Sequence, residues 1–278
     1  MEFQRTLDTI RLITDMWNSM GISYTLKHGT YTTILESEMG KHKFMLNSYS
    51  NRVFIARNKV LKDLKESELA KEIMQGDYST KNFGISDRLQ NMDEDKILNI
   101  DISSAYPHAI YNAGLISEET FNYLKGLKKG EKLPCLGMLA GSHVKLKYES
   151  GKVTDYYAHR EPTAQIFFLL IQEVNDVMEE CKWILGDDYI FHWVDGVFFK
   201  KSTSVKKINQ VEKIFEDLKF PYKYESVKNF SLRKNGENYV ISMNKNGEDK
   251  RYEFNHRNDY QTIKRYITQQ AKGNVHRV

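Results

Sequence analysis

The sequence has little of what marks secreted or membrane-spanning proteins. Its 278 residues include two cysteines, Cys135 and Cys181, which lie in apolar stretches and in no metal-binding spacing. They predict reduced core thiols in a cytoplasmic protein. No apolar run approaches the ~18 residues that a membrane span needs. Residues 1–17 have the pattern of a charged amphipathic helix instead of a secretory signal, so we expect no membrane association.

The composition is that of a globular protein with no internal repeat and no low-complexity segment. Hydrophobic residues make up 40% and charged residues 28% of the chain, which is long enough for one large or two modest domains. The net charge of +4 is compatible with a nucleic-acid partner but does not require one.

Hydrophobic periodicity predicts a small α+β module over residues 1–80. The pattern indicates a helix, four short strands and a second helix, at residues 3–19, 22–27, 31–36, 43–48, 52–57 and 59–75. Glycine and asparagine residues mark the turns between the strands. Residues 81–95 are polar and rich in turn formers, so we expect a linker there.

The second predicted domain covers residues 96–256 and is also α+β, an antiparallel sheet with packed helices. Its strands are expected at 96–101, in a hairpin around Asp195-Gly196, and at 222–227, 229–233, 238–243 and 250–254. Its clearest helices are expected at 163–183 and 204–218. A basic C-terminal helix is predicted within residues 257–278.

Two carboxylates occupy unusual places in this second domain. Asp101 ends an apolar strand and Asp195 lies at the tip of a hairpin. The simpler explanations are that Asp101, Ser103 or Ser104 caps a helix, and that Asp195-Gly196 is a common tight turn. If the hairpin lies beside the strand, the carboxylates come within about 6 Å and repel unless a cation separates them. Mg²⁺ or Mn²⁺ bridged to substrate phosphates suits such a site and supports two-metal nucleotidyl transfer.

The residues around these aspartates resemble two motifs of the B-family DNA polymerases. The stretch from Asp101 to Pro107, DISSAYP, is similar to their first motif, Asp-x-x-Ser-Leu-Tyr-Pro. Val194-Asp195-Gly196-Val197 is similar to the third, with Asp195 at the second aspartate of Asp-Thr-Asp and Trp193 at the first. The likeness extends over about residues 96–255, to the polymerase palm of the short protein-primed bacteriophage enzymes, without an exonuclease motif.

Two further family motifs are degraded in this chain. Only Gly141 remains of the second motif, where Ala140 replaces a tyrosine. Tyr239 matches the tyrosine of the Lys-x-Tyr motif, where Glu237 replaces the lysine.

The resemblance implies a role for each matching residue. Asp101 and Asp195 would be catalytic and would hold the metal ions together with the carbonyl of Ile102. The residues implied to bind the nucleotide are Ser103 and Ser104 through their amides, Tyr106 beneath the sugar, and Lys128 and Lys132 at the triphosphate.

Nucleic-acid contacts are expected from Lys200, Lys201 and Tyr239. Each of these assignments has a simpler alternative, because Tyr106 could be a core aromatic and the lysines a solvated charge run.

The sequence thus predicts a nucleotidyltransferase, a small B-family-like DNA polymerase or primer-synthesising polymerase in phage or mobile-element replication. Its partners would be DNA, as primer and template or as a single strand, nucleoside triphosphates and replication proteins. The alternative is a degenerate palm that binds DNA or a replication partner without chemistry, as Trp193, Ala140 and Glu237 suggest. An unrelated two-metal nuclease is disfavoured, since no further carboxylate cluster accompanies the two aspartates.

Overall fold

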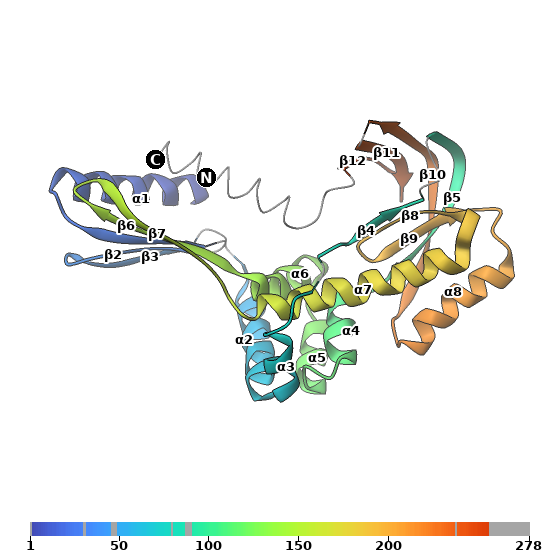
Figure 1. Ribbon diagram of the computed structural model, residues 1–278, viewed down its shortest axis with the longest axis horizontal. Coiled ribbons are helices and arrows are strands. Elements are labelled where there is room, and N and C mark those ends of the chain that lie inside the picture. The colour runs from blue at the N-terminus through green and yellow to red at the C-terminus, as the bar shows by residue number, and fades with distance from the viewer. Residues whose placement is uncertain are drawn as a thin grey trace. The chain divides into compact units, whose positions relative to one another are not determined.

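The protein is α+β, with antiparallel sheets and packed helices, as predicted (Figure 1). The computed structural model describes residues 2–29, 32–45, 49–78, 80–86, 91–236 and 238–255. The chain divides into two compact units. The first holds the described residues up to Gly76 together with Leu127–Phe167, and the second holds Asp77–Gly126 and the described residues from Phe168 onward. The predicted boundary near residue 96 is therefore corrected, because residues 127–167 belong with the N-terminal part.

The first unit contains an antiparallel sheet whose described strands have the order β3-β2-β1-β6-β7. The hairpin of β6 and β7 joins the free edge of β1, with Leu26 opposite Leu146. Helix α1 packs on one face, where Ile10 and Trp17 cluster with Tyr24 and Leu35. The bounds of these elements are α1 (Glu2–Ser19), β1 (Tyr24–Gly29), β2 (Thr32–Ser37), β3 (Gly40–Met45), β6 (Ser142–Glu149) and β7 (Lys152–Arg160).

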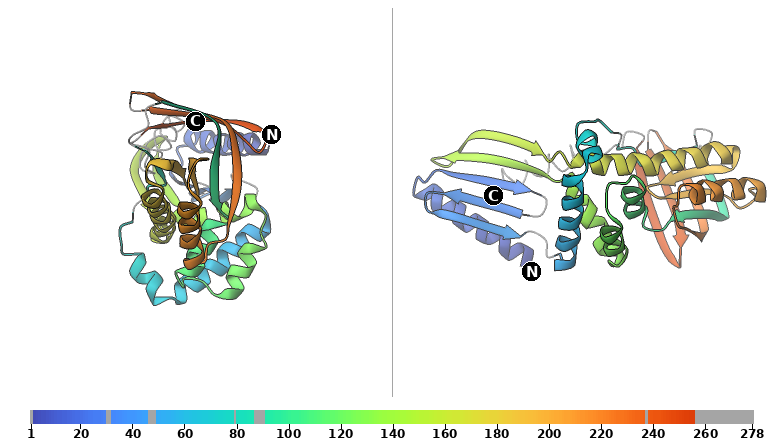
Figure 2. Two further views of the ribbon diagram at one scale, coloured as in Figure 1. Left: turned by 90° about the vertical axis from the view of Figure 1, so that its right-hand side faces the viewer. Right: turned by 90° about the horizontal axis from the view of Figure 1, so that it is seen from below.

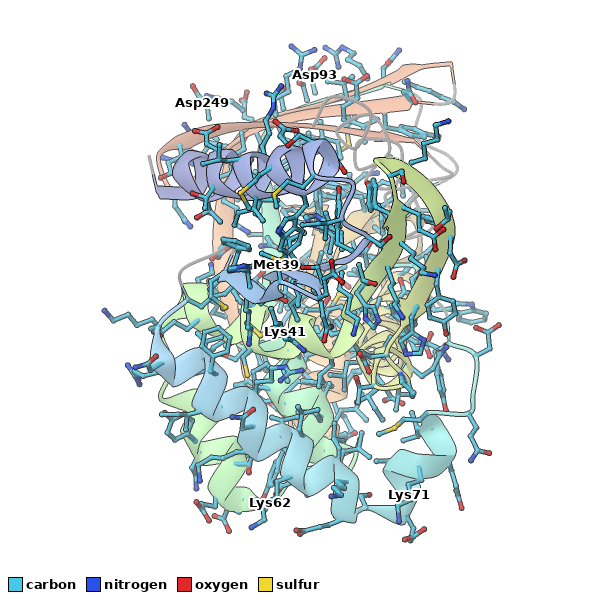
Figure 3. All side chains as sticks on the ribbon, turned by 90° about the vertical axis from the view of Figure 1, so that its left-hand side faces the viewer. Met39, Lys41, Lys62, Lys71, Asp93 and Asp249 are labelled. Carbon is cyan, nitrogen blue, oxygen red and sulfur yellow. The ribbon has the colours of Figure 1, made fainter. Side chains whose placement is uncertain are left out.

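Helices complete the first unit. They are α2 (Asn51–Glu66), α3 (Glu68–Ile73), α6 (Lys129–Gly137) and the short 3-10 helix η1 (Met138–Ala140). The strand predicted at 52–57 is wrong, because this segment begins α2. Val53, Ala56, Val60 and Leu64 are buried at helical spacing. The outer sides of α2 and α3 carry charged residues such as Lys62 and Lys71, as Figure 3 shows.

The second unit is built on a sheet whose described strands have the order β12-β11-β10-β5-β9-β8-β4, all antiparallel. Their bounds are β4 (Phe83–Ile85), β5 (Asn91–Ile102), β8 (Tyr189–Trp193), β9 (Gly196–Lys200), β10 (Tyr222–Asn235), β11 (Asn238–Lys245) and β12 (Glu248–Asn255). The predicted linker at 81–95 is corrected, because it contains β4 and the start of β5.

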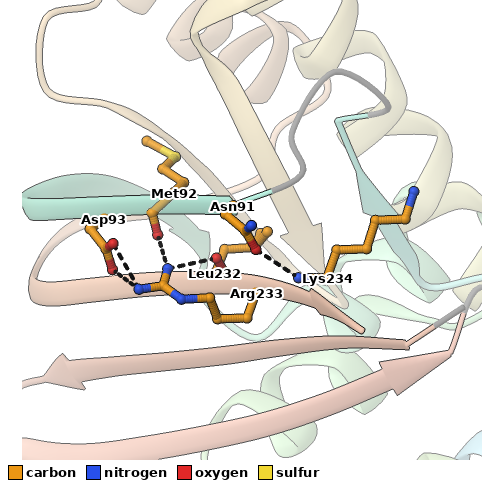
Figure 4. A network of polar contacts seen from close by, with 6 residues as sticks. All are labelled: Asn91, Met92, Asp93, Leu232, Arg233 and Lys234. Carbon is orange, nitrogen blue, oxygen red and sulfur yellow. Dashed lines mark hydrogen bonds and ion pairs between the residues drawn. The ribbon is translucent and has the colours of Figure 1, made fainter. Parts of the chain in front are cut away.

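Strands β5 and β10 form the long central pair of this sheet. At one end of the pair, Arg233 donates to both carboxylate oxygens of Asp93 at 2.7 Å and to the carbonyl of Met92 at 3.2 Å (Figure 4). The two strands predicted at 222–227 and 229–233 are one strand, β10, interrupted by a bulge. Asn229 lies in the bulge with a φ of 50°, a conformation that asparagine tolerates better than most residues.

Helix α8 (Val205–Asp217) packs on one face of this sheet. The helices of the second unit are α4 (Ala105–Asn112), α5 (Glu118–Lys125), α7 (Ala164–Leu185, which begins in the first unit), η2 (Gly186–Asp188) and α8. Tyr222 and Tyr224 of β10 donate hydrogen bonds to Glu216 and Glu212 of α8. Because side chains alternate along a strand, Lys223 lies on the face away from α8.

None of the helices in the described part of the chain is long and apolar enough to cross a membrane. The predicted basic C-terminal helix, residues 257–278, lies outside the described residues, as does Glu237.

Candidate functional site

Asp101 and Asp195 lie next to each other in the second unit. Asp101 is near the end of β5 and pairs with Gly196 of β9, while Asp195 directly precedes Gly196. The N–H of Ile102 donates a hydrogen bond to the Asp195 carbonyl oxygen at 2.8 Å. The expectation that the hairpin lies beside the first strand is thus confirmed. The separation of the two carboxylate groups remains a prediction.

The turn that carries Asp195 has a strained backbone. Trp193 pairs with Gly196, so the loop consists of Val194 and Asp195, one residue earlier than the predicted Asp195-Gly196 turn. Val194 has a φ of 54°, which is a rare conformation for a β-branched residue and costs on the order of 1–3 kcal/mol. Its N–H donates to the Asn82 carbonyl at 2.7 Å, which helps to hold the turn. Strain of this kind occurs often at functional sites.

Gly196 allows the side chains of β5 to approach the hairpin closely. A methyl group on Gly196 would lie 3.0 Å from Oδ1 of Asn99 and 3.2 Å from Oδ1 of Asp101. Gly196 therefore matters through this close approach and not through a left-handed turn conformation, since a side chain there would push Asn99 and Asp101 aside by a few tenths of an ångström. The Asn99 Oδ1 atom is buried and has no hydrogen-bond partner among the described residues.

A charged network joins Asp101 to β10 and β11. Lys223 lies opposite Asp101 across the β5–β10 pair, and its Nζ is 3.4 Å from Oδ2 of Asp101 and 2.5 Å from Oε1 of Glu225. Lys245 contacts the other Glu225 oxygen at 2.5 Å, and Asn99 donates to the same oxygen at 3.1 Å. The Asp101 carboxylate therefore has a fixed cation on one side.

The protonation states of this network follow from burial and pairing. Burial of Glu225 acts to raise its pKa, but hydrogen bonds and charges from Lys223 and Lys245 outweigh it and hold the pKa at about 2. The hydrogen bond to Glu225, together with the charges of Asp101 and Glu225, raises the pKa of Lys223. Glu225 and Lys223 are therefore both ionised at neutral pH. The sequence does not predict that Lys223 and Glu225 belong to the site. Alternation along β10 shows only that they share a face, and the register of β10 against β5 is needed to place them beside Asp101.

Tyr106 lies in the first turn of helix α4, which begins shortly after Asp101 in the sequence. Burial, and secondarily the charge of Asp195, raises the pKa of its phenol, which stays protonated at neutral pH. Ser104 precedes α4 in the left-handed conformation, with φ 59° and ψ 50°, and its side chain makes no capping hydrogen bond to the helix. A left-handed residue thus lies near each aspartate in the sequence, Ser104 three positions after Asp101 and Val194 directly before Asp195.

Ser103 cannot have the role predicted for its backbone. Its N–H donates to the Pro221 carbonyl at 2.7 Å, so it is not available to a phosphate oxygen in this conformation. The assignment is corrected, because the loop before β10 already satisfies this donor.

Lys128 and Lys132 belong to the first unit, as does Ala140 of the degraded second motif. Lys128 precedes α6, where its backbone N–H donates to Oε2 of Glu131 at 2.9 Å. Within the second unit, the site consists of Asp101, Asp195 and their neighbours, and the assignment of Lys128 and Lys132 to the triphosphate stays a prediction.

The three predicted nucleic-acid contacts differ in their surroundings. Lys200 ends β9, Lys201 follows it and is exposed, and the Lys200 carbonyl accepts a hydrogen bond from Thr203 Oγ1 at 2.6 Å. Tyr239 is buried, with 1% of its surface exposed, in the core cluster of the second sheet. A side chain buried in the core cannot contact a nucleic acid, so the predicted nucleic-acid contact of Tyr239 is corrected.

The residues beside Asp195 are structural. Trp193 packs edge-on against Tyr252, with ring centroids 4.6 Å apart. His192 is fully buried and is hydrogen-bonded to the Tyr189 hydroxyl at 2.9 Å and to Oδ1 of Asn175 at 3.2 Å. Burial lowers the pKa of His192 to about 4, so its ring is neutral.

The donor atoms at the site are oxygens, but they are few. The described residues contain no group of three or more His, Cys, Asp or Glu side chains arranged to hold a metal ion. Asp101, Asp195 and the backbone carbonyl of Ile102 would supply part of an oxygen shell. Mg²⁺ commonly binds one or two carboxylates and completes its shell with water and substrate phosphates. The residues fit a cation that arrives with a phosphorylated substrate better than a permanently bound metal.

Comparison with known proteins gives no independent assignment. No protein-family model matches the chain, and no curated protein matches it in sequence.

Proposed function

We propose that this chain is a nucleotidyltransferase with a reduced polymerase-type palm. The observation that carries the proposal is the pairing of Asp101 with Gly196, which brings Asp195 beside the end of β5. Two neighbouring aspartates, Asp101 near the end of β5 and Asp195 in the strained turn before β9, are an arrangement suited to phosphoryl chemistry. The motif resemblance around both residues supports the same assignment.

Each residue has a definite part in the proposed reaction. Asp101 and Asp195 would hold Mg²⁺ or Mn²⁺ against the triphosphate of the incoming nucleotide. When bound, the metal ions would activate the attacking oxygen and stabilise the leaving oxygen. Lys223 and Gly196 keep the Asp101 carboxylate in place, through an ion pair and through close approach. The protonated phenol of Tyr106 would contact the sugar. The proposed substrates are DNA and nucleoside triphosphates, in the replication of a phage or mobile element.

A second candidate is a binding module without catalysis. It is favoured by Lys223, whose ammonium group already lies 3.4 Å from Asp101. A built-in cation neutralises part of the charge that would otherwise attract a metal. Trp193 also stands where the family's first aspartate would be, has no carboxylate to offer a metal, and packs against Tyr252. In this alternative the palm holds DNA or a replication partner.

Nucleotide incorporation by the full chain tests the two candidates. Labelled deoxynucleoside and ribonucleoside triphosphates are supplied with Mg²⁺ or Mn²⁺, with and without primer and template. Asp101→Asn and Asp195→Asn should each lower incorporation at least about a hundredfold, the effect of losing a few kcal/mol of transition-state stabilisation. The matched control is Asp93→Asn, which removes the same charge from the same strand at its ion pair with Arg233. It should incorporate at nearly the wild-type rate.

The outcomes separate the candidates. Equal incorporation by wild type and Asp195→Asn would show that the chemistry does not use this site. If the wild type and all variants incorporate nothing but bind DNA alike, the binding module is the correct assignment.

A further inference from the structure

The sheet of the first unit has one face that the described helices of that unit leave uncovered. Helix α1 packs on the opposite face, against Tyr24 and Leu35. Because side chains alternate along each strand, the residues next to these point away from α1. Figure 2 (right) shows the strands in front of α1 from this side, and α2 and α3 lie beside the strand ends in Figures 1 and 2.

One row of directly paired residues crosses this face from edge to edge. Lys43 pairs with Ile34, Ile34 with Lys27, Lys27 with Lys145, and Lys145 with Tyr157. Neighbouring strands are about 4.8 Å apart, so the row is about 19 Å long. Three of its five residues are lysines, and a tyrosine ends it. We call these five residues the lysine row.

The adjacent row on the same face is charge-balanced. Lys41 lies 3.6 Å from Glu36, and Lys147 lies 2.8 Å from Glu149. Figure 3 shows Lys41 on the side of the sheet away from α1. These lysines have the ordinary partners of a solvated sheet surface.

The lysine row lacks this balance. In the part of the chain that the structure describes, no carboxylate forms a salt bridge with Lys27, Lys43 or Lys145. Lys27 and Lys145 are direct cross-strand partners. Like charges in directly opposed positions destabilise a sheet. A repulsive pair in the middle of an open face costs stability and is offset when a polyanion binds across it.

The end of the row adds a stacking surface. Tyr157 is 54% exposed, and its ring lies nearly parallel to that of His159, with 5.9 Å between centroids and an interplanar angle of 14°. The His159 ring in turn lies 5.1 Å from that of His143. Exposed aromatic rings beside a basic track are the usual platform for the bases of a single strand.

We propose that the lysine row binds single-stranded nucleic acid. Lys27, Lys43 and Lys145 contact successive phosphates, and a base stacks on Tyr157. A line of charges on an open sheet suits a linear polyanion better than a compact anion, for which a pocket with converging donors would be expected. This site is separate from Asp101 and Asp195, so it is tested without reference to their chemistry.

Binding of a labelled oligodeoxythymidine of about 16 nucleotides, measured by fluorescence anisotropy on the full chain, tests the proposal. The triple variant Lys27→Gln, Lys43→Gln, Lys145→Gln should bind at least about tenfold more weakly at low salt. Its slope of log K against log salt should fall by about 2, since each single-strand phosphate contact contributes about 0.7. Its thermal unfolding midpoint should equal or exceed that of the wild type, because a like-charge pair is removed.

The matched control removes three lysines from α2 and α3 of the same unit, through Lys62→Gln, Lys65→Gln and Lys71→Gln, and should bind like the wild type. Tyr157→Ala should weaken oligonucleotide binding at least about fivefold, while leaving heparin binding unchanged because heparin has no bases.

Three results would overturn the proposal. The first is unchanged oligonucleotide binding by the triple variant. The second is an equal loss in the control, which would indicate a general charge effect. The third is a triple variant that binds the oligonucleotide like the wild type but no longer binds phosphatidylserine vesicles. That result would assign the face to a membrane surface.

Discussion

Replacing Glu225 by glutamine removes the central charge of the network that also holds Asp101. The Glu225 side chain is 8% exposed and both its oxygens contact lysines. A pKa of about 2, instead of the usual 4.5, corresponds to about 3 kcal/mol of stability at neutral pH. Because Lys223 is half exposed and screened by water, we expect Glu225→Gln to cost about 2 kcal/mol at pH 7.

The stability contribution of Glu225 should fall as the pH falls. The folded pKa of Glu225 is depressed, so its contribution is complete above pH 4.5 and disappears as the pH falls through about 2. The difference between wild type and Glu225→Gln should therefore shrink from about 2 kcal/mol at pH 7 to about 1 kcal/mol at pH 3.

Urea unfolding followed by the fluorescence of Trp193 measures this difference in the second unit alone. Trp17→Phe and Trp183→Phe in both proteins remove the other two tryptophans. The control is Glu248→Gln, which breaks an exposed ion pair with Lys250 and should cost less than about 0.5 kcal/mol. A difference that is the same at pH 7 and pH 3, or that is no larger than the control's, would refute the reasoning.

Three further predictions concern residues packed around the site. Gly84→Ala places a methyl group 2.5 Å from the His192 ring and should destabilise the second unit by about 1–3 kcal/mol, as measured by thermal unfolding. The His192 ring, with its pKa lowered to about 4 by burial, should still be neutral at pH 5.5 in an NMR titration, and the fold should lose stability as the pH falls from 6.5 towards 4. Gly196→Ala should displace Asp101 and reduce nucleotide incorporation about tenfold or more while the chain stays folded, as circular dichroism would verify.

Elements with strong local signals could be predicted from the sequence. The helix expected at 163–183 is α7 (Ala164–Leu185), and the Ser204 side chain caps α8 by accepting from the Lys207 N–H. The hairpin of β8 and β9 could also be predicted, because two arms rich in aromatic residues and valine meet at a short turn, although the turn lies one residue earlier than expected. In each case the deciding residues lie within a few positions of one another.

Elements whose structure depends on distant partners could not be predicted. The short stretch at 52–57 fits either a strand or a helix, and only burial of Val60 and Leu64 further along decides for α2. The pairing of β6 with β1 joins segments more than a hundred residues apart in the chain, and no local pattern specifies which edge a hairpin joins. Because β6 pairs with β1, residues 127–167 belong to the first unit, and this could not be predicted either.

The same distinction applies to the candidate site. The neighbourhood of Asp101 and Asp195 was anticipated because each lies in a recognisable local pattern. Lys223 and Glu225 enter the site only through the register of β5 against β10. The errors at Ser103 and Tyr239 have the same origin. The hydrogen bond from the Ser103 N–H to the Pro221 carbonyl and the burial of Tyr239 in a core are both set by the tertiary fold.

The most direct test of the central claim is Mn²⁺ binding to the full chain, measured by electron paramagnetic resonance with and without a nucleoside triphosphate. It requires no knowledge of primer or template. If Asp101 and Asp195 act together on a metal-bound nucleotide, the wild type should bind Mn²⁺ more tightly when the triphosphate is present, and Asp101→Asn and Asp195→Asn should each lose that gain while Asp93→Asn keeps it. A gain of the same size in the wild type and in both site variants, or no gain in the wild type, would contradict the account.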